Sequence, residues 1–269
     1  MQPSSDSETS PLTPPTALYW RKKLQAAAMH LGICMLVALI VYLLMNHVWY
    51  PNGLLTLAGG LKFFLVLVVC DVVLGPVITL IVYSIKKPKR ERIMDLTVIA
   101  LIQLAALLYG LHAIVMARPA FVVFTGYKIS AINATNVEAD ELKLAKFPQF
   151  SYVSWQGPVP AIALMPKDKT QQQLVTSHAI EGKGLEYMVR FYEPINGAHF
   201  QILQTALKPI DQLKSIAPER KQDIDQALTN SQLDATTAGW LDVETSAGYG
   251  VVIVDQRTGA LTQFLDIDA

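Results

Sequence analysis

Three long runs of apolar residues dominate the first half of the chain. They cover Leu24–Met45, Leu61–Ile85 and Ile93–Met116, and segments with more polar residues separate them. A helix rises about 1.5 Å per residue, so about 20 apolar residues cross a hydrocarbon core about 30 Å thick. Each run is at least that long, and we therefore predict three transmembrane helices. The first run is too long for the apolar part of a secretory signal, and residues 46–52 offer no small-residue cleavage site, so we expect it to be retained.

The distribution of basic residues gives these spans an orientation. Residues 46–60, between the first and second runs, contain no Lys or Arg. Basic residues lie instead before the first run and between the second and third, at Arg21, Lys22, Lys23, Lys86, Lys87, Lys89, Arg90 and Arg92. Because positively charged loops stay on the cytoplasmic side, we expect the N-terminus and the loop 86–92 in the cytoplasm. Three crossings then leave residues 118–269 outside it.

The first residues have a different composition. Ser, Thr and Pro account for eleven of the first sixteen residues. Such a segment has too little apolar surface to offset the entropy cost of ordering it. We expect residues 1–20 to form a disordered cytoplasmic tail, which serves as a spacer or carries a regulatory role.

Charge and cysteine content narrow the function of the part after the third span. The chain is neutral overall, but residues 119–269 carry 12 basic and 17 acidic residues, against 10 and 5 in residues 1–118. This part has no basic surface for nucleic acid, so we expect no nucleic-acid partner. Cys34 and Cys70 both lie in predicted spans, so no disulfide is expected after the third span. About 150 residues can bury a core without one.

Short patterns after the third span predict a mixed α+β domain. Strand-like runs lie at Phe121–Phe124, Lys128–Ile132 and Ala161–Met165, the second placed to pair with the first. Helical patterns cover Pro209–Ala217 and a segment that begins at Pro218 and ends near Leu228. Near the C-terminus, a turn ending in Gly259 separates Gly250–Asp255 from Ala260–Ile267, which is typical of a β-hairpin. We predict three transmembrane α-helices followed by an α+β domain that ends in this hairpin.

Motifs for catalysis or cofactor binding are absent from the sequence. It contains no G-x-S-x-G, no phosphate-binding G-x-x-x-x-G-K and no Cys/His cluster. His178 and His199 stand 21 residues apart without ligand-like neighbours. We therefore expect no catalytic residue, no metal and no cofactor.

One carboxylate, Asp71, lies deep inside the second apolar run. An ionisable group inside a span is costly and suggests a functional site. Asp71 lies 14 residues, about 21 Å, from the cytoplasmic end of its span, whereas Asp95 lies two residues, about 3 Å, into the third span. The two carboxylates are too far apart in depth to share a proton, as they would in an intramembrane aspartyl protease. Gln103 and Tyr109, at about 15 and 24 Å on the third span, bracket the level of Asp71.

Two interpretations of Asp71 follow from these depths. It forms a hydrogen-bonded contact inside the bundle, with Gln103 or Tyr109, or it faces a helix of a partner protein and pairs with a polar group there. Gly75-Pro76 predicts a local break in the same span, since proline removes one backbone hydrogen bond. Gly110 belongs to a stripe of small residues on the third span where another helix can approach closely.

The membrane motifs resemble a known family. The stretches DVVLGPVITLIVY (71–83), DLTVIALIQLAALLYGLHAI (95–114) and ARPAFVVF (117–124) resemble the TfpX/TfpZ-type family of type IV pilin accessory proteins. The C-terminal VVIVDQRTGALTQFLDID (251–268) is also similar to the end of those proteins. The strong part covers residues 62–124, residues 127–244 are only loosely similar, and the Ser/Pro-rich tail departs from the family.

The resemblance implies a non-enzymatic accessory factor of type IV pilus biogenesis in a bacterial inner membrane, with a periplasmic domain at 118–269. It implies a pilin as partner, through its membrane helix and its external head, together with membrane lipids and the pilus assembly machinery. Pilins of this class wait in the membrane as single helices with a globular head. The residues expected to shape the contact or the bundle are Asp71, Gly75, Pro76, Asp95, Gln103, Tyr109, Gly110 and Arg118.

Two other function classes remain as alternatives. A membrane-anchored periplasmic sensor or regulator predicts a domain that a ligand stabilises and an effect of deleting residues 2–18. A pilin-modifying enzyme predicts a nucleophile or a metal cluster, and the sequence shows neither.

Overall fold

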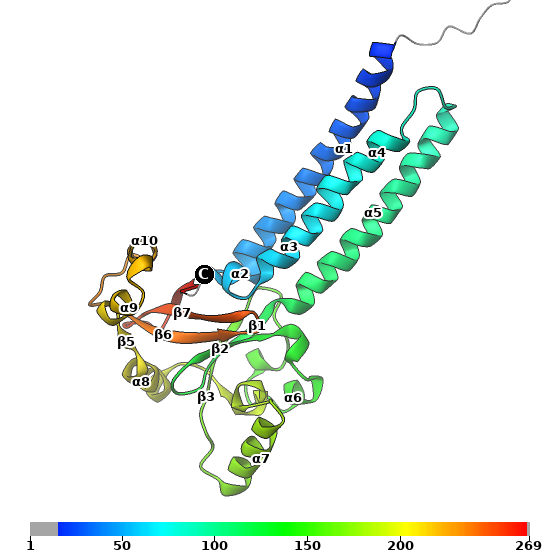
Figure 1. Cartoon of the computed structure of the whole chain (residues 1–269). Helices are drawn as coiled ribbons and strands as arrows, with labels where there is room; N and C mark the ends of the chain where they lie inside the picture. Colours follow the sequence, from blue (N-terminus) through cyan, green and yellow to red (C-terminus); the bar gives the residue numbers. More distant parts are fainter. Residues whose placement is uncertain (1–15, 268–269) are drawn as a thin grey trace, which may run out of the picture. The chain divides into compact units, whose positions relative to one another are not determined.

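The computed structural model describes residues 16–267 (Figure 1). Three helical segments in this range are long and apolar enough to cross a membrane, at Ala17–Trp49, Gly60–Val82 and Lys89–Ala117. The first consists of α1 Thr16–Leu44 and a π-helical turn, η1 Met45–Trp49. The second consists of α3 Gly60–Val68, the π-helical turn η2 Val69–Leu74 and α4 Gly75–Val82, and the third is α5 Lys89–Ala117. The prediction of three spans is confirmed.

The helices of the structure do not end at the same residues as the predicted segments. Most of the expected tail, residues 1–15, lies outside the described residues, but residues 16–20 are the first turns of α1. Ala17, Leu18, Tyr19 and Trp20 are apolar or aromatic and extend the apolar run, so the helix begins before the basic residues. The second span ends at Val82 instead of Ile85, because Tyr83 already has an extended backbone.

The chain folds as two compact units. The helical unit comprises residues 16–38 and 67–108, and the sheet unit comprises residues 39–66 and 109–267. The sheet unit therefore contains the connection between the first two spans as well as the domain that follows the third. That connection holds one short helix, α2 Leu54–Leu57.

A mixed sheet organises the sheet unit. Its strands follow the order β4-β3-β1-β2-β6-β7-β8, and β5 pairs with β6 off this path. Pairs β1–β3 and β2–β6 are parallel, and the other pairs are antiparallel. The strands are β1 Pro119–Phe124, β2 Ile129–Asn133, β3 Val159–Ala163, β4 Tyr192–Glu193, β5 Lys208–Pro209, β6 Ala238–Thr245, β7 Gly248–Asp255 and β8 Leu261–Leu265.

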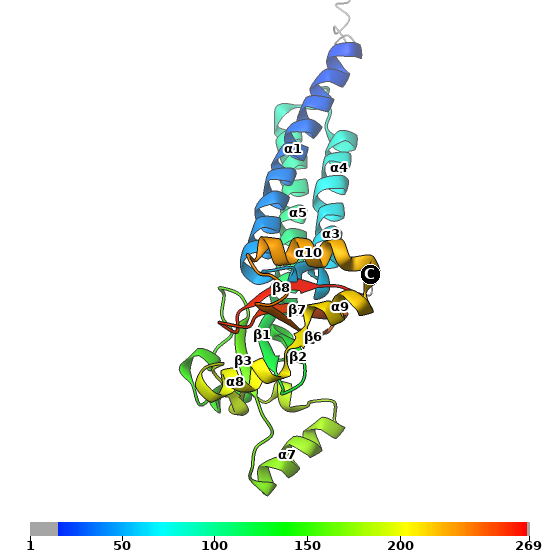
Figure 2. The ribbon, with the colours of Figure 1, turned by 90° about the vertical axis from the view of Figure 1, so that its left-hand side faces the viewer.

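Helices lie in the longer connections between these strands. They are α6 Ala139–Lys143, α7 Lys169–Ile180, α8 Gly197–Ala206, α9 Ile210–Ile216 and α10 Lys221–Asn230. Short 3-10 turns occur at Ala134–Asn136, Pro148–Phe150, Leu185–Tyr187, Val189–Phe191 and Pro218–Arg220. Figure 2 shows α9 and α10 beside β7 and β8. The α+β class is thus confirmed.

Two apolar cores stabilise the sheet unit. In the first, the rings of Phe121, Phe150 and Tyr192 meet edge to face, with centroids 5.2 to 6.2 Å apart. Edge-to-face pairs are favourable because the positive ring edge meets the negative ring face. In the second core, α9 and α10 place Leu213 and Ile224 in the same cluster as Trp240 of β6 and Ile253 of β7.

The connection between the first two spans lies against the last strand. The backbone N–H of Phe264 in β8 donates to the carbonyl of Asn52 at 2.7 Å, and the Asn52 amide donates to the carbonyl of Leu261 at 3.2 Å. The hydroxyl of Thr245 in β6 donates to the carbonyl of Leu57 at 3.0 Å. β8 is the terminal strand on the sheet path, so these bonds cover backbone groups that an edge strand otherwise exposes.

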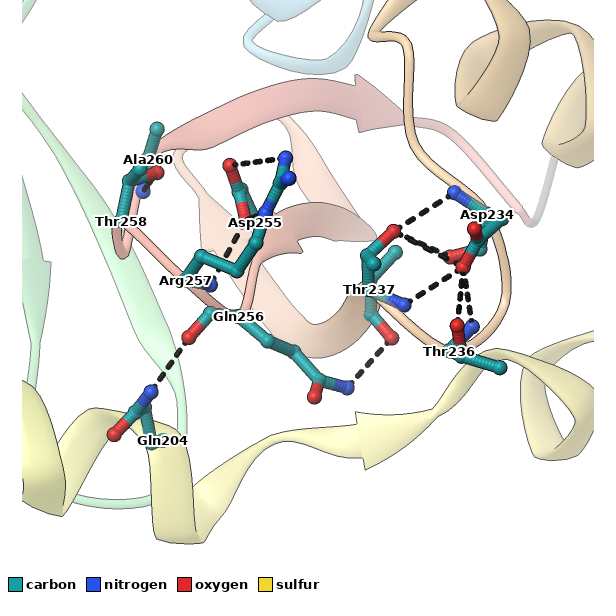
Figure 3. Close-up of polar contacts among 10 residues, drawn as sticks. Gln204, Asp234, Thr236, Thr237, Asp255, Gln256, Arg257, Thr258 and Ala260 are labelled. Atoms are coloured by element: carbon teal, nitrogen blue, oxygen red, sulfur yellow. Dashed lines mark hydrogen bonds and ion pairs between the residues drawn. The ribbon is translucent and has the colours of Figure 1, made fainter.

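Two carboxylates fix the turns near the end of β7 (Figure 3). Oδ1 of Asp234 accepts from the backbone N–H groups of Thr236 and Thr237 at 2.8 and 2.9 Å and from both threonine hydroxyls at 2.6 and 3.0 Å. Oδ1 of Asp255 accepts from the backbone N–H and Nε of Arg257 at 2.8 and 3.2 Å. Hydrogen bonds to the charged form, above all those from Thr236 and Thr237, lower the pKa of Asp234 to about 2.

This pKa predicts a pH-dependent contribution to stability. The unfolded chain binds the proton of an Asp near pH 3.9, so the folded state is stabilised above that pH and loses the effect as the pH falls toward about 2. We expect the thermal unfolding temperature of Asp234→Asn to lie below that of the wild type at neutral pH. This difference should shrink between about pH 5 and pH 2 in detergent-solubilised protein. A difference that stays constant with pH would show that the charge of Asp234 is irrelevant.

Candidate functional site

A pocket of about 190 Å³ opens among the helices of the helical unit. Most of its wall is apolar, and its polar side chains are His30 of α1, Asp71 of η2 and Gln103 of α5. The remaining lining residues are Ile33, Cys34, Val37, Ala38, Leu67, Ala100, Leu104 and Leu107. All three membrane helices therefore contribute to one site at the place where the sequence predicted a polar feature.

Asp71 lies in the π-helical turn η2. A π turn inserts an extra residue into a helix and is frequent at functional sites. The residue is only 7% exposed, and its Oδ1 has no hydrogen-bond partner among the described residues. An unpaired polar atom in an apolar pocket has a free-energy cost of about 1–3 kcal/mol.

The backbone around Asp71 explains the roles of Gly75, Pro76 and Gln103. In a π turn the carbonyl of residue 71 would accept from the N–H of residue 76, but Pro76 has no N–H. Nε2 of Gln103 lies 3.5 Å from that carbonyl and donates to it. Gly75 leaves room for this contact, because a Cβ at position 75 would overlap the Gln103 amide. The predicted break at Gly75-Pro76 is thus bridged from α5.

A second polar contact joins the first and second spans. Nδ1 of His30 lies 2.6 Å from Oγ1 of Thr79. Thr79 is 1% exposed, so its hydroxyl has no access to an external electrophile. The His–Thr pair therefore forms a polar bridge between the first and second spans.

Of the two partners that we considered for Asp71 inside the bundle, Gln103 forms a hydrogen bond with it. Gln103 bonds the backbone carbonyl of Asp71, not the carboxyl group, because the π turn and Pro76 leave that carbonyl in need of a donor. Tyr109 is 78% exposed on α5. The carboxyl group of Asp71 itself has no hydrogen bond to either Gln103 or Tyr109 among the described residues.

The other predicted residues have separate surroundings. Asp95 forms an ion pair with Lys87, 2.5 Å between Oδ2 and Nζ, at the loop between the second and third spans. Gly110 is half-buried in α5. Neither residue lines the pocket around Asp71.

Arg118 follows α5 directly and lies, like the end of that helix, in the sheet unit. It is 4% exposed, and its guanidinium donates to the carbonyl of Val115 at 2.5 Å and to the carbonyl of Ser154 at 3.2 Å. It also lies over the ring of Trp155, 4.9 Å from the centroid, and Trp155 packs on Trp49. The Val115 bond satisfies a carbonyl of the last helical turn, so the surroundings of Arg118 indicate a structural role.

Sequence reasoning missed His30 as a member of the pocket. His30 lies inside the apolar run 24–45, and ionisable side chains are rare in such runs, so its position was a sign of a polar contact. The depth of His30 relative to Asp71 depends on how α1 is turned, and a sequence pattern does not give that rotation. Residues 16–267 also contain no group of three or more His, Cys, Asp or Glu side chains that could hold a metal ion.

Comparisons with known proteins find relatives that are named fimbrial assembly proteins. A family model described as fimbrial assembly protein FimB matches residues 18–59. The chain is 34% identical over 119 residues to the fimbrial assembly protein of serogroups C1 and C2 of Dichelobacter nodosus, which covers 44% of this chain and 91% of that relative. It is 25% identical over 244 residues to the fimbrial assembly proteins of serogroups I and E1 of the same organism, covering 90% of this chain and 94% of each relative. No solved structure matches the chain.

Proposed function

Because this chain belongs to the family of fimbrial assembly proteins, we propose that it is a non-enzymatic accessory factor of type IV pilus biogenesis that binds a pilin subunit in the inner membrane. In this role it protects the pilin or passes it to the assembly machinery, as a pilin-specific chaperone or assembly modulator. The relatives named as fimbrial assembly proteins support a role in fimbria biogenesis.

The pocket around Asp71 is the observation that carries the binding role. It combines apolar walls from α1 and α5 with a buried carboxyl oxygen that the described part of the chain does not satisfy. A catalytic site would need a nucleophile and a base that substrate can reach, but the hydroxyl group paired with His30 belongs to Thr79, which is buried. A recognition site for another membrane helix fits these features better.

The sheet unit suits a second contact with the same partner. The basic loop 86–92 joins the second and third spans and favours the cytoplasm. The sheet unit adjoins the other ends of these two spans, so we place it in the periplasm. A pilin with one membrane helix and a globular head would then meet a helix face in the bilayer and a folded domain outside it. Packing would give most of the affinity, and polar groups would select the partner.

Deleting the gene and restoring it on a plasmid tests the proposal. We expect surface pilin to fall in the deletion strain and to return with the plasmid, while pilin messenger RNA stays constant. A loss of total cellular pilin would indicate protection from degradation, and retained cellular pilin would indicate delivery.

Two results would contradict the proposal. Unchanged surface and cellular pilin would remove the accessory role. A parallel fall of pilin messenger RNA would favour the sensor or regulator. An empty plasmid serves as the control.

A further inference from the structure

No group in the described part of the chain forms a hydrogen bond to Oδ1 of the Asp71 carboxyl. The amide of Gln103 bonds the backbone carbonyl of Asp71, and Nδ1 of His30 is engaged with Thr79. The pocket lining contains neither Lys nor Arg. Oδ1 of Asp71 therefore has no hydrogen-bond partner among the described residues, although only 7% of the residue's surface is exposed.

The apolar side chains that line the pocket indicate what kind of molecule binds there. Ile33 and Val37 of α1 and Leu104 and Leu107 of α5 line it. Ile33 and Leu104 are 56% and 51% exposed, so the apolar faces of both helices remain open beside the carboxyl group. A lipid chain matches such walls but carries no donor. The side chains of a partner helix supply both an apolar face and a polar group.

From these two observations we infer that the pocket binds a membrane helix of the partner through a hydrogen-bond donor, an N–H or O–H group that pairs with the Asp71 carboxyl. This inference deepens the proposed function and rests on it, since the partner helix is that of the pilin subunit. The donor is either a cationic ammonium or guanidinium group or a neutral amide or hydroxyl. A hydrogen bond from this donor to Asp71 removes the free-energy cost of the unsatisfied carboxyl oxygen, so the pocket binds the partner helix in preference to lipid.

Photo-crosslinking in cells tests the contact in the full-length wild type. A photoreactive amino acid at Leu104 lies on the pocket wall, and one at Leu101, which is 60% exposed and does not line the pocket, is the matched control on the same helix. We expect a pilin adduct at Leu104 that exceeds the Leu101 adduct several-fold. Equal yields at both positions, or an adduct only at Leu101, would overturn the inference without any need for a variant of Asp71.

Substitutions at Asp71 then test the donor. Asp71→Leu removes both acceptor oxygens and leaves a side chain of similar volume. We expect the Leu104 adduct to fall about 3-fold if the lost hydrogen bond is between neutral groups and up to about 30-fold if it involves a charged group. Asp71→Asn keeps one acceptor and removes the charge, so a full adduct indicates a neutral donor and a reduced one indicates a cationic donor. Cys70→Ala, at the exposed neighbouring position, is the control.

The outcomes separate this inference from the proposed function. A wild-type adduct at Leu104 that persists in Asp71→Leu at equal protein level would overturn the role of the carboxyl and leave pilin binding intact. If gene deletion leaves both pilin pools unchanged, the proposed function itself fails, and an adduct of Leu104 with another membrane protein would identify a different partner. An adduct with lipid only would show that the pocket is open to the bilayer and would contradict the inference.

Discussion

Replacing Gly53 by alanine is expected to unfold the sheet unit at a markedly lower temperature. Gly53 has φ of +91°, and a Cβ at this position would overlap the backbone carbonyl of Phe264 and lie 2.8 Å from the Gln263 amide nitrogen. Strain of the left-handed backbone and the forced shift of β8 together cost about 2–4 kcal/mol. For a unit of this size we expect the unfolding temperature to fall by about 5–15 °C, measured by tryptophan fluorescence of detergent-solubilised protein.

Gly182 gives a matched control for this substitution. It has φ of +80°, but nothing lies within 4 Å of a Cβ built there. Gly182→Ala therefore adds only the backbone strain, about 1 kcal/mol. Equal effects of the two substitutions would mean that the contact between the 50–59 connection and β8 contributes nothing to stability.

The ion pair between Glu141 and Arg190 is expected to produce the second large effect. Nε of Arg190 donates to Oε1 and Oε2 of Glu141 at 2.9 and 3.1 Å, which ties α6 to the turn Val189–Phe191. The Glu141 side chain is 11% exposed and the Arg190 side chain 32%. Breaking a fully buried pair costs about 3–5 kcal/mol, and partial exposure of Arg190 reduces this, so we expect Glu141→Gln to destabilise by about 2 kcal/mol.

The adjacent residue provides the comparison. Asp140 pairs with Lys143 at 2.8 Å, but both side chains are at least 75% exposed. Exposed pairs contribute about 0–1 kcal/mol, so Asp140→Asn should leave the denaturant midpoint nearly unchanged. The same midpoint in Glu141→Gln and the wild type would show that water already screens the buried pair.

Apolar run length was enough to predict the membrane part of the fold. The runs at 24–45, 61–85 and 93–116 each overlap one of the three long apolar helices of the structure, and a helix satisfies its own backbone hydrogen bonds in a bilayer. The short strand patterns at 121–124 and 128–132 also overlap β1 and β2, which pair. The residues within each of these elements are enough to predict its helix or strand.

Elements with weak local patterns escaped the sequence analysis. Helix α7 has the sequence KTQQQLVTSHAI, in which only Val175 is buried. Its start is marked by Asp168, whose carboxylate accepts from the N–H of Gln171, but the apolar stripe that indicates a helix is almost absent. Strand β6 was missed because burial along Ala238–Thr245 does not alternate.

The pocket likewise combines features that the sequence predicts with features that it does not. Depth along the spans placed Gln103 near Asp71, and the structure joins them. The π turn that holds Asp71, and the rotation of α1 that brings in His30, depend on packing between helices and have no sequence pattern of their own.

The bonds between Asn52 and β8 also set the order in which the protein can finish folding. Asn52 and Leu261 are 209 residues apart in the chain. At a synthesis rate of about 5–20 residues per second, the ribosome needs about 10–40 seconds to make the residues between them. During that time the connection after the first span is already outside the ribosome, but its partner strand does not yet exist. The sheet unit therefore completes its fold only after β8 has been made, and segment 50–59 must be kept from pairing with other strands until then.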